Sequence, residues 1–310
     1  MPRDRRHSLF LMTEDVNAFL RQIEQSPKYR ALKLCPSTVR DVIEMELARH
    51  KKKTAAADAA RKRLHRIAAT YLGEPNYRES LQRLANTTHS PGTLLAACSE
   101  ILEAHTSTSE RLTYLSDFYS SVFSVSGLPR TILDLACGLN PFALPWMNNP
   151  ALRSYDAYDC NGARVQFLNQ AFAALQWPAA AFCEDILISP PAEPADVALL
   201  LKECHRMEER CRGITRRAIE GLKVDWLILS VPRMNRKGDR ASNGRFRQVL
   251  SDIVTSLGKE WRELMFPHET VACIHLNKKG PSPGSMLNGI DRQRLPERAS
   301  KQAPPPTRPV

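Results

Sequence analysis

The chain has 310 residues, of which 43% are hydrophobic and 25% are charged, and its formal net charge is +11. These proportions are typical of a folded globular protein, and no apolar run reaches the roughly 20 residues that cross a bilayer. We therefore expect a cytoplasmic protein. The eight cysteines include no C-x-x-C pair, so the sequence predicts neither a disulfide framework nor a metal site.

Positive charge is concentrated in two stretches. Residues 1–66 hold 16 Lys and Arg against 8 Asp and Glu, and residues 232–247 hold six basic residues against one acidic residue. Such clusters suit a polyanion because each phosphate contact releases counterions, although a solvated basic surface has the same pattern. The side chains that we single out as candidate RNA contacts are Arg61, Lys62, Arg63, Arg66, Arg233, Arg236 and Lys237.

The first 128 residues show helical periodicity throughout. Residues 15–23 place apolar side chains at helical spacing, residues 37–47 begin with capping chemistry after Pro36, and residues 55–71 combine strong helix formers with a basic face. Residues 108–123 form a further amphipathic segment. We predict a helical, basic domain over residues 1–128, and its charge favours nucleic acid as a partner.

From residue 129 the pattern changes to short apolar runs that alternate with helical segments. The runs are TILDLAC, SYDAYD, AAFCEDI, DVALLL and DWLILSV, and residues 261–266 and 270–276 read as a closing antiparallel pair. Alternating strands and helices predict an α/β fold, a doubly wound sheet with helices on both faces. We place this domain at residues 129–280 and predict that the Pro-rich residues 281–310 are a disordered tail.

The ends of the first three predicted strands carry small or acidic residues. The first strand closes on Ala136-Cys137-Gly138, the second on Asp159 and the third on Asp185. Ligands of doubly wound sheets bind at these strand ends, and such acids can accept from ribose hydroxyls and an adenine amino group. The turn has a single glycine and Pro141 removes a backbone donor, so S-adenosylmethionine fits better than NAD, which needs a pyrophosphate site. A turn without a ligand remains an alternative.

Several stretches resemble the 16S rRNA guanine-N7 methyltransferases that give resistance to aminoglycosides. Residues 26–40, SPKYRALKLCPSTVR, resemble the N-terminal signature of that family. Residues 105–112, HTSTSERL, resemble its HxSTxERL motif, and residues 134–141, DLACGLNP, are similar to its cofactor loop. The resemblance covers roughly residues 20 to 280. It implies a Rossmann-like, seven-stranded S-adenosylmethionine-dependent methyltransferase domain with an N-terminal helical domain.

The resemblance also implies where the cofactor lies. Arg111 is expected to hold its methionine carboxylate, Asp159 its ribose, and Asp185 with Ile186 its adenine. The other expected cofactor residues are Tyr71, His105, Thr106, Ser107, Ala136, Gly138 and Leu201. Considered alone, Arg111 could instead pair with a nearby acid, and His105 could cap a helix. Asp134 is expected to orient the loop by hydrogen bonding to backbone.

The implied reaction is methylation of N7 of a decoding-site guanine of 16S rRNA in the assembled small subunit, by a monomer. Guanine N7 has an exposed lone pair, so we predict no general base and a mechanism that depends on alignment. The chain departs from the family pattern after Lys202 and over residues 230–238. Two alternatives therefore stay open: a methyltransferase of another RNA, and a non-catalytic RNA-binding or ribosome-assembly protein.

Overall fold

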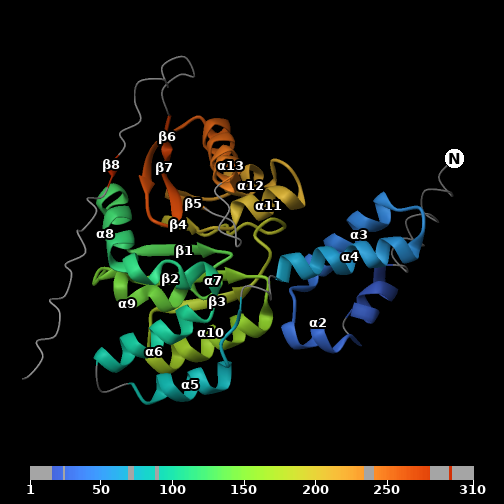
Figure 1. The fold of residues 1–310 in the computed structure, drawn as a ribbon, viewed down its shortest axis with the longest axis horizontal. Helices are drawn as coiled ribbons and strands as arrows, with labels where there is room; N and C mark the ends of the chain where they lie inside the picture. The colour runs from blue at the N-terminus through green and yellow to red at the C-terminus, as the bar shows by residue number, and fades with distance from the viewer. Residues whose placement is uncertain are drawn as a thin grey trace, which may run out of the picture.

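The structure is a computed structural model that describes residues 16–23, 25–68, 73–87, 91–233, 241–279 and 293–294. Its first part is helical (Figure 1). Residues 16–23 are helical, and they are followed by α2 (Pro27–Leu32), α3 (Pro36–Arg49), α4 (Lys53–Ala68), α5 (Tyr77–Ala85), α6 (Pro91–Glu103), α7 (Thr106–Ser109), the 3-10 helix η2 (Leu112–Tyr114) and α8 (Leu115–Ser126).

Local signals in the sequence set several of these helix ends. Pro27 and Pro36 occupy the first positions of α2 and α3, where a residue without an amide donor loses no helical hydrogen bond. The side chain of Asn76 caps α5 by accepting from the amide of Glu79. Gly127 ends α8 with a φ of +78°, a conformation that glycine adopts without strain.

The second part of the chain alternates strands and helices. The strands are β1 (Thr131–Leu135), β2 (Ser154–Asp159), β3 (Ala179–Cys183), β4 (Ala195–Leu200), β5 (Val224–Pro232), β6 (Lys259–Met265), β7 (Glu269–Lys279) and the two-residue β8 (Gln293–Arg294). The helices between them are η3 (Asn140–Ala143), α9 (Leu144–Met147), α10 (Gly162–Leu175), α11 (Cys204–Arg210), α12 (Ile214–Glu220) and α13 (Ala241–Leu257).

All these strands form one sheet in the order β3-β2-β1-β4-β5-β7-β6-β8. Strands β1 to β5 pair in parallel, whereas β7 runs antiparallel to both β5 and β6. The predicted doubly wound sheet of seven strands and its antiparallel closing pair are therefore confirmed. Strand β8 adds a short parallel pairing to β6 within the predicted tail, whose other residues lie outside the described ranges.

Helices cover both faces of the sheet (Figure 1). One face is covered by α5, α6, α8, α9 and α10. These helices share a core with β1 and β2, and the core includes Phe118, Phe142 and Phe167. On the other face, α11, α12 and α13 pack on Leu133, Leu227 and other strand residues. The helices α5 to α8 thus belong to the core of the sheet, although they precede its first strand in the chain.

The N-terminal helical unit, which we define as residues 16–68, has a core of its own around Val42, Ile43 and Leu64. It lies beside the sheet (Figure 1). A short backbone pairing joins the two, because Leu34 bridges Asn161 and the amide of Cys35 donates to the carbonyl of Cys160 at 2.8 Å. The predicted domain division at residue 128 stays a prediction, and the separate cores suggest a second possible division between residues 68 and 77.

Among the described helices, none has the length and the apolar character that a bilayer crossing requires.

Candidate cofactor and substrate site

Two adjoining cavities open at the carboxyl ends of the strands. The larger has a volume of about 460 Å³ and lies where β1, β2 and β4 end, beneath α7 and α11. The smaller has a volume of about 130 Å³ and lies towards the end of β3. Ala136, Asp159 and Glu203 line both cavities, so the two spaces are neighbours along the edge of the sheet.

The structure brings most of the predicted cofactor residues to these cavities. The larger cavity is lined by His105, Thr106, Ser107, Arg111, Ala136, Gly138, Asp159 and Leu201. The smaller one is lined by Asp185 and Ile186 together with Ala136 and Asp159. Tyr71 lies outside the described residues. These residues come from five separate segments of the chain and meet only in the folded sheet.

The turn after β1 forms the floor of the larger cavity. Ala136 has a φ of +53° and Gly138 a φ of +55°, so two residues of the turn are left-handed. The amide of Gly138 donates to Asp159 Oδ2 at 3.0 Å and the amide of Cys137 to the carbonyl of Tyr158, which ties the turn to the end of β2. A Cβ at Gly138 would lie 3.7 Å from His105 Cε1, so the imidazole covers the turn closely.

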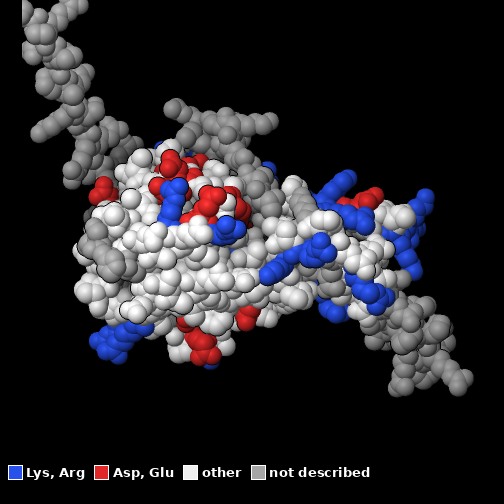
Figure 2. Space-filling view, turned by 90° about the horizontal axis from the view of Figure 1, so that it is seen from below, with Lys and Arg blue, Asp and Glu red and all other residues white. Residues whose placement is uncertain are grey.

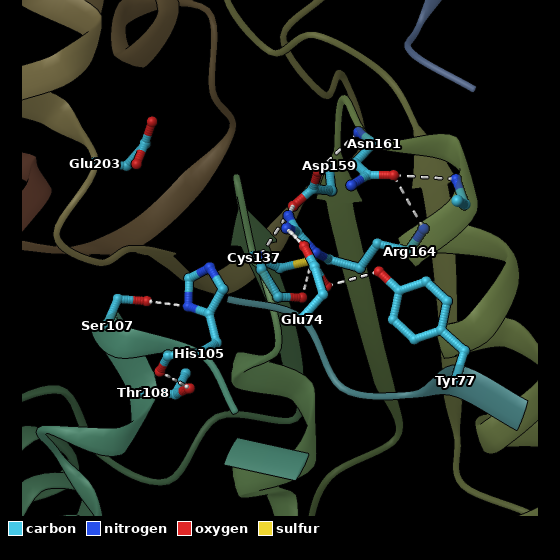
Figure 3. A network of polar contacts seen from close by, with 12 residues as sticks. Glu74, Tyr77, His105, Ser107, Thr108, Cys137, Asp159, Asn161, Arg164 and Glu203 are labelled. Atoms are coloured by element: carbon cyan, nitrogen blue, oxygen red, sulfur yellow. Dashed lines mark hydrogen bonds and ion pairs between the residues drawn. The ribbon is translucent and has the colours of Figure 1, made fainter. Parts of the chain in front are cut away.

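Asp159 holds an ion pair that the sequence did not suggest. Its Oδ2 accepts from Arg164 Nη1 at 2.7 Å, and Arg164 also pairs with Glu74, which accepts from the Tyr77 hydroxyl (Figure 3). The side-chain oxygen of Asn161 caps α10, and the backbone amide of Asn161 donates to Asp159 Oδ1. The sequence did contain a signal for the Asp159–Arg164 pair, because an acid at the end of a strand is followed five residues later by an arginine in the first turn of the next helix.

Two buried donors beside Asp159 have no hydrogen-bond partner among the described residues. They are Nε of Arg164 and Nδ2 of Asn161. Buried donors without partners cost free energy, so such atoms in a native fold call for a ligand or water. Arg164 lines the larger cavity and Asn161 lines neither, so these two enclosed atoms do not themselves point to a ligand. Asp159 does line both cavities, and its carboxylate is an acceptor of the kind that ribose hydroxyls require, so the site fits a nucleoside cofactor.

Arg111 is fully buried and forms a fork with an acid of β7. Its Nε and Nη2 donate to Glu269 at 2.7 and 2.9 Å, and its Nη1 donates to Asn140 Oδ1 at 3.1 Å. These bonds use three of the five N–H donors of the guanidinium, which leaves up to two for a ligand in the cavity. Arg111 is thus paired with an acid, but it is buried and its partner is 158 residues away, unlike a surface arginine paired with a neighbouring acid. Binding of the cofactor carboxylate stays a prediction.

The charge on Glu269 depends on this fork. Burial opposes ionisation, but the Arg111 guanidinium outweighs it, and Lys202 and the Ser230 hydroxyl add to the effect, so the pKa of Glu269 falls to about 2. Glu269 is separated from Arg111 by 158 residues, and no local pattern in the sequence indicated the pair.

Asp134 and His105 are also buried at the cavity. Asp134 accepts from the Tyr155 hydroxyl at 2.5 Å and from Asn140 Nδ2 at 3.0 Å. It therefore orients the loop through side chains, and the expected hydrogen bonds to backbone are not among those described. Burial lowers the pKa of His105 to about 3, so the ring is neutral at pH 7, and its Nδ1 is 2.8 Å from Ser107 Oγ.

At the smaller cavity, Asp185 connects the sheet to the N-terminal helical unit. Its Oδ2 accepts from the Thr38 hydroxyl of α3 at 2.9 Å and from Arg210 Nη1 at 2.5 Å. Arg210 also donates to Asp41 of α3 at 2.6 Å. Helix α3 thus holds Asp185 and Arg210 from behind, while Arg63, Arg66 and Ile67 of α4 line the smaller cavity itself.

The outer rim of the larger cavity is formed by the segment after β4 and by α13. His205 and Phe246 meet there edge to face, with ring centroids 4.6 Å apart. Burial lowers the pKa of His205 to about 3, and its Nδ1 has no partner among the described residues. Burial also raises the pKa of Glu203, between this rim and the smaller cavity, to about 6.

The predicted RNA contacts are only partly at the surface. Arg61, Lys62 and Arg66 are exposed on α4, whereas Arg63 is half-buried and donates to Glu46 of α3 at 2.5 Å. Arg233 is half-buried and donates to the carbonyl of Phe266, and Arg236 and Lys237 lie outside the described residues. Figure 2 shows Lys and Arg gathered over the N-terminal helical unit, with few acids beside them.

The doubly wound sheet, its antiparallel β7 and the nucleoside-type site define an α/β methyltransferase. The model of the ribosomal RNA methyltransferase (FmrO) family matches residues 25–259. The chain is 32% identical over 231 residues to a 16S rRNA (guanine(1405)-N(7))-methyltransferase of Frankia casuarinae, covering 73% of this chain and 80% of the relative. It is 34% identical over 218 residues to the same enzyme of Serratia marcescens, covering 70% and 81%.

Solved structures agree with these relatives. The 16S rRNA methyltransferase RmtF in complex with S-adenosyl-L-homocysteine has a TM-score of 0.71 and 28% identity, covering 84% of this chain and 98% of the other. The 16S rRNA methylase RmtB has a TM-score of 0.67 and 30% identity, covering 86% and 98%. The chain belongs to the ribosomal RNA methyltransferase (FmrO) family, which confirms the predicted resemblance, fold and enzyme class.

Proposed function

We propose that the chain transfers the methyl group of S-adenosylmethionine to N7 of a decoding-site guanine of 16S rRNA. The order of residues along the cavities carries this proposal. Arg111 lines only the larger cavity, Asp159 lines both, and Asp185 lines only the smaller one. Carboxylate, ribose and adenine follow one another in the same order along that cofactor.

Each end of the site offers matching chemistry. The two remaining N–H donors of Arg111 suit a carboxylate, which forms strong, charge-assisted hydrogen bonds with a guanidinium. Asp159, which lines both cavities, can accept from ribose hydroxyls, and Asp185 with Ile186 can receive the adenine. When bound, S-adenosylmethionine supplies an electrophilic methyl group.

The target base would enter at the rim of the larger cavity. The His205 and Phe246 rings line the cavity there and can contact a guanine that has left its helix. Guanine N7 carries its lone pair at neutral pH, so no residue has to remove a proton. The protein contributes alignment of the base with the methyl group and exclusion of water.

The partner in this proposal is 16S rRNA within the assembled small ribosomal subunit, and the enzyme acts as a monomer in the cytoplasm. The exposed Arg61, Lys62 and Arg66 would contact phosphates of the rRNA. A methylated N7 places a positive charge and added bulk in the decoding site. Both oppose the binding of gentamicin- and kanamycin-type aminoglycosides, so we propose that the activity gives resistance to these cationic drugs.

Transfer of labelled methyl groups tests the proposal. The full-length enzyme is offered intact small subunits, naked 16S rRNA and tRNA in parallel, and the modified nucleotide is mapped. We expect label only in intact subunits and at a guanine N7 of the decoding site. Label in tRNA or naked rRNA would move the target to another RNA. Cofactor binding without any transfer would contradict the enzymatic proposal and favour an RNA-binding protein.

A further inference from the structure

Two cysteines from different units meet at the junction of the N-terminal helical unit and the sheet. Cys35 directly precedes α3, and Cys183 is the last residue of β3. The two thiols interact, because each shifts the pKa of the other. Both residues reach the turn after β2, because the backbone amide of Cys35 donates to the Cys160 carbonyl at 2.8 Å and Cys183 Sγ is 4.0 Å from the same oxygen.

Gly162 shows how tightly this junction is packed. A Cβ at that position would lie 3.2 Å from Cys183 Sγ and 2.4 Å from the carbonyl oxygen of Lys33. The chain segment before Cys35 and the sulfur of Cys183 therefore approach the same turn from two sides. The backbone pairing of residues 33–35 with residues 160–162 holds Cys35 at the turn that Cys183 also contacts.

The two thiols differ in acidity in the way that disulfide chemistry requires. The hydrogen bond from Cys183 lowers the pKa of Cys35 to about 5, with further help from Ser37 and the Thr38 amide at the start of α3. The same interaction raises the pKa of Cys183. At neutral pH Cys35 is a thiolate, the nucleophilic form, beside a protonated partner.

The other cysteines of the chain offer a contrast. Burial raises the pKa of Cys98, Cys137, Cys160, Cys204 and Cys273, so these thiols are protonated and inert. Cys211 is half-buried and lies near Arg217 on the far side of α12. Its sulfur interacts with backbone and with an arginine, and it has no thiol beside it among the described residues.

We propose that Cys35 and Cys183 are a redox-active pair, which a peroxide converts into a reversible disulfide between the helical unit and the sheet. The Cys35 thiolate attacks the peroxide, an S–O bond forms, the O–O bond breaks, and the departing hydroxide takes up a proton. The Cys183 sulfur then attacks the sulfenic acid, the S–S bond forms, and the hydroxyl leaves as water with the Cys183 proton. Two thiols lose two electrons, and hydrogen peroxide becomes two waters.

The position of the pair gives the modification a consequence. Helix α3, which follows Cys35, supplies Thr38 to Asp185 and Asp41 to Arg210 at the smaller cavity. A disulfide would fix the start of this helix to the end of β3. Transient, sensing disulfides of this kind are the type found in reducing compartments. The inference does not depend on the proposed RNA target.

Oxidation of the full-length reduced protein with hydrogen peroxide tests the pair. Mass spectrometry of a non-reduced digest should find the Cys35 and Cys183 peptides joined with the loss of two hydrogens. Titratable thiols in denaturant should fall by two from the eight of the reduced chain, and dithiothreitol should restore them. Cys183→Ser should abolish the cross-link and leave a sulfenic acid on Cys35 that dimedone traps. Cys211→Ser, the matched control, should form the cross-link as the wild type does.

A folded wild-type protein that gives no cross-link between these two residues would overturn the proposal, and circular dichroism establishes that it is folded. A cross-link to another cysteine would also overturn it. As an independent readout, the oxidised wild type should unfold at a higher temperature than the reduced form. Peroxide should give no such increase in Cys183→Ser.

Discussion

Arg111 carries its charge at a place from which water is excluded, and Glu269 compensates that charge. The fork between them is reinforced by hydroxyls of Tyr114 and Ser230, both of which donate to the same carboxylate. A buried ion pair of this kind contributes little net stability compared with an apolar pair. Removing one partner, however, leaves the other charge buried without compensation, which is strongly destabilising. Single changes at this pair should therefore have large effects.

Glu269→Gln should lower the free energy of unfolding by about 3 kcal/mol, because the Arg111 guanidinium would stay buried without a counter-charge. Denaturant-induced unfolding measures the change. Glu260→Gln on the exposed side of β6 is the matched control and should change stability by less than about 0.5 kcal/mol. Equal effects of the two variants would show that the fork contributes no special stability.

The same pair predicts how stability depends on pH. The pKa of Glu269 is about 2 in the folded protein and near 4.5 in an unfolded chain, so the folded state favours the carboxylate. Its contribution of roughly 3 kcal/mol is present above pH 4.5 and is lost as the pH falls towards 2. Unfolding measured between pH 5 and 3 should show a steeper loss for the wild type than for Glu269→Gln. Parallel curves would contradict this assignment.

Arg111→Lys keeps the positive charge but removes the planar fork. We expect the affinity for S-adenosyl-L-homocysteine, measured by calorimetry, to fall at least tenfold, which is about 1.4 kcal/mol. Arg130→Lys is the control, because Arg130 lies at the opposite end of β1. Unchanged affinity in a folded Arg111→Lys protein would remove this residue from the cofactor site.

At the scale of an element, α4 shows why a run of basic residues does not make a uniform surface. Arg61, Lys62 and Arg66 point to solvent, whereas Arg63 lies at helical spacing from Ala56 and Ala60, on the buried face. Arg63 therefore reaches Glu46 of α3 and the carbonyl of Arg210. One helix thus divides its charges between solvent and the packing of its own unit.

This division predicts two separate phenotypes. Replacing Arg61, Lys62 and Arg66 together by Ala should weaken binding to small subunits and reduce the salt slope of log K by roughly two to three units, with little change in stability. Arg63→Ala should instead lower stability by about 2 kcal/mol, because Glu46 is left buried without its closest partner. A triple variant with an unaltered salt slope would exclude α4 from the RNA interface.

The elements themselves could be predicted well, and the contacts between them less well. The alternation of apolar runs with helical segments identified β1 to β5 and the segments after them that carry Asp159 and Asp185. Strands and their ends can be predicted in this way because they depend on the spacing of apolar residues and on the turn residues next to them. Arg164 and Glu269 were missed, since their roles depend on pairings across the fold. Arg63 was assigned to the surface from its charge, although the positions of Ala56 and Ala60 indicate the buried face.

At the scale of the whole molecule, the chain has more than one core, and the cores do not follow the change from helices to strands. Helices α5 to α8 precede the sheet in the sequence but fill one of its faces, with Phe118 and Tyr119 fully buried there. Residues 16–68 keep a separate core. We therefore propose that the functional division falls between residues 68 and 77, ahead of the one expected at residue 128.

Truncation distinguishes the two divisions. A chain that starts at residue 73 keeps α5 to α8 and should fold, with cooperative thermal unfolding by circular dichroism. A chain that starts at residue 129 loses that layer, exposes one apolar face of the sheet and should aggregate or remain unfolded. Cooperative unfolding of the shorter chain would support the division at residue 128 and contradict ours.

The place of β7 in the sheet also governs when the protein can finish folding during its synthesis. Strand β7 lies between β5 and β6, so the edge of β5 stays unpaired until residues 269–279 have left the ribosome. Arg111 is made 158 residues before Glu269. At about 5–20 residues per second, the interval is on the order of ten to thirty seconds. A nascent chain stalled within this interval carries an unpaired sheet edge and an uncompensated arginine, which makes it a natural client for chaperones.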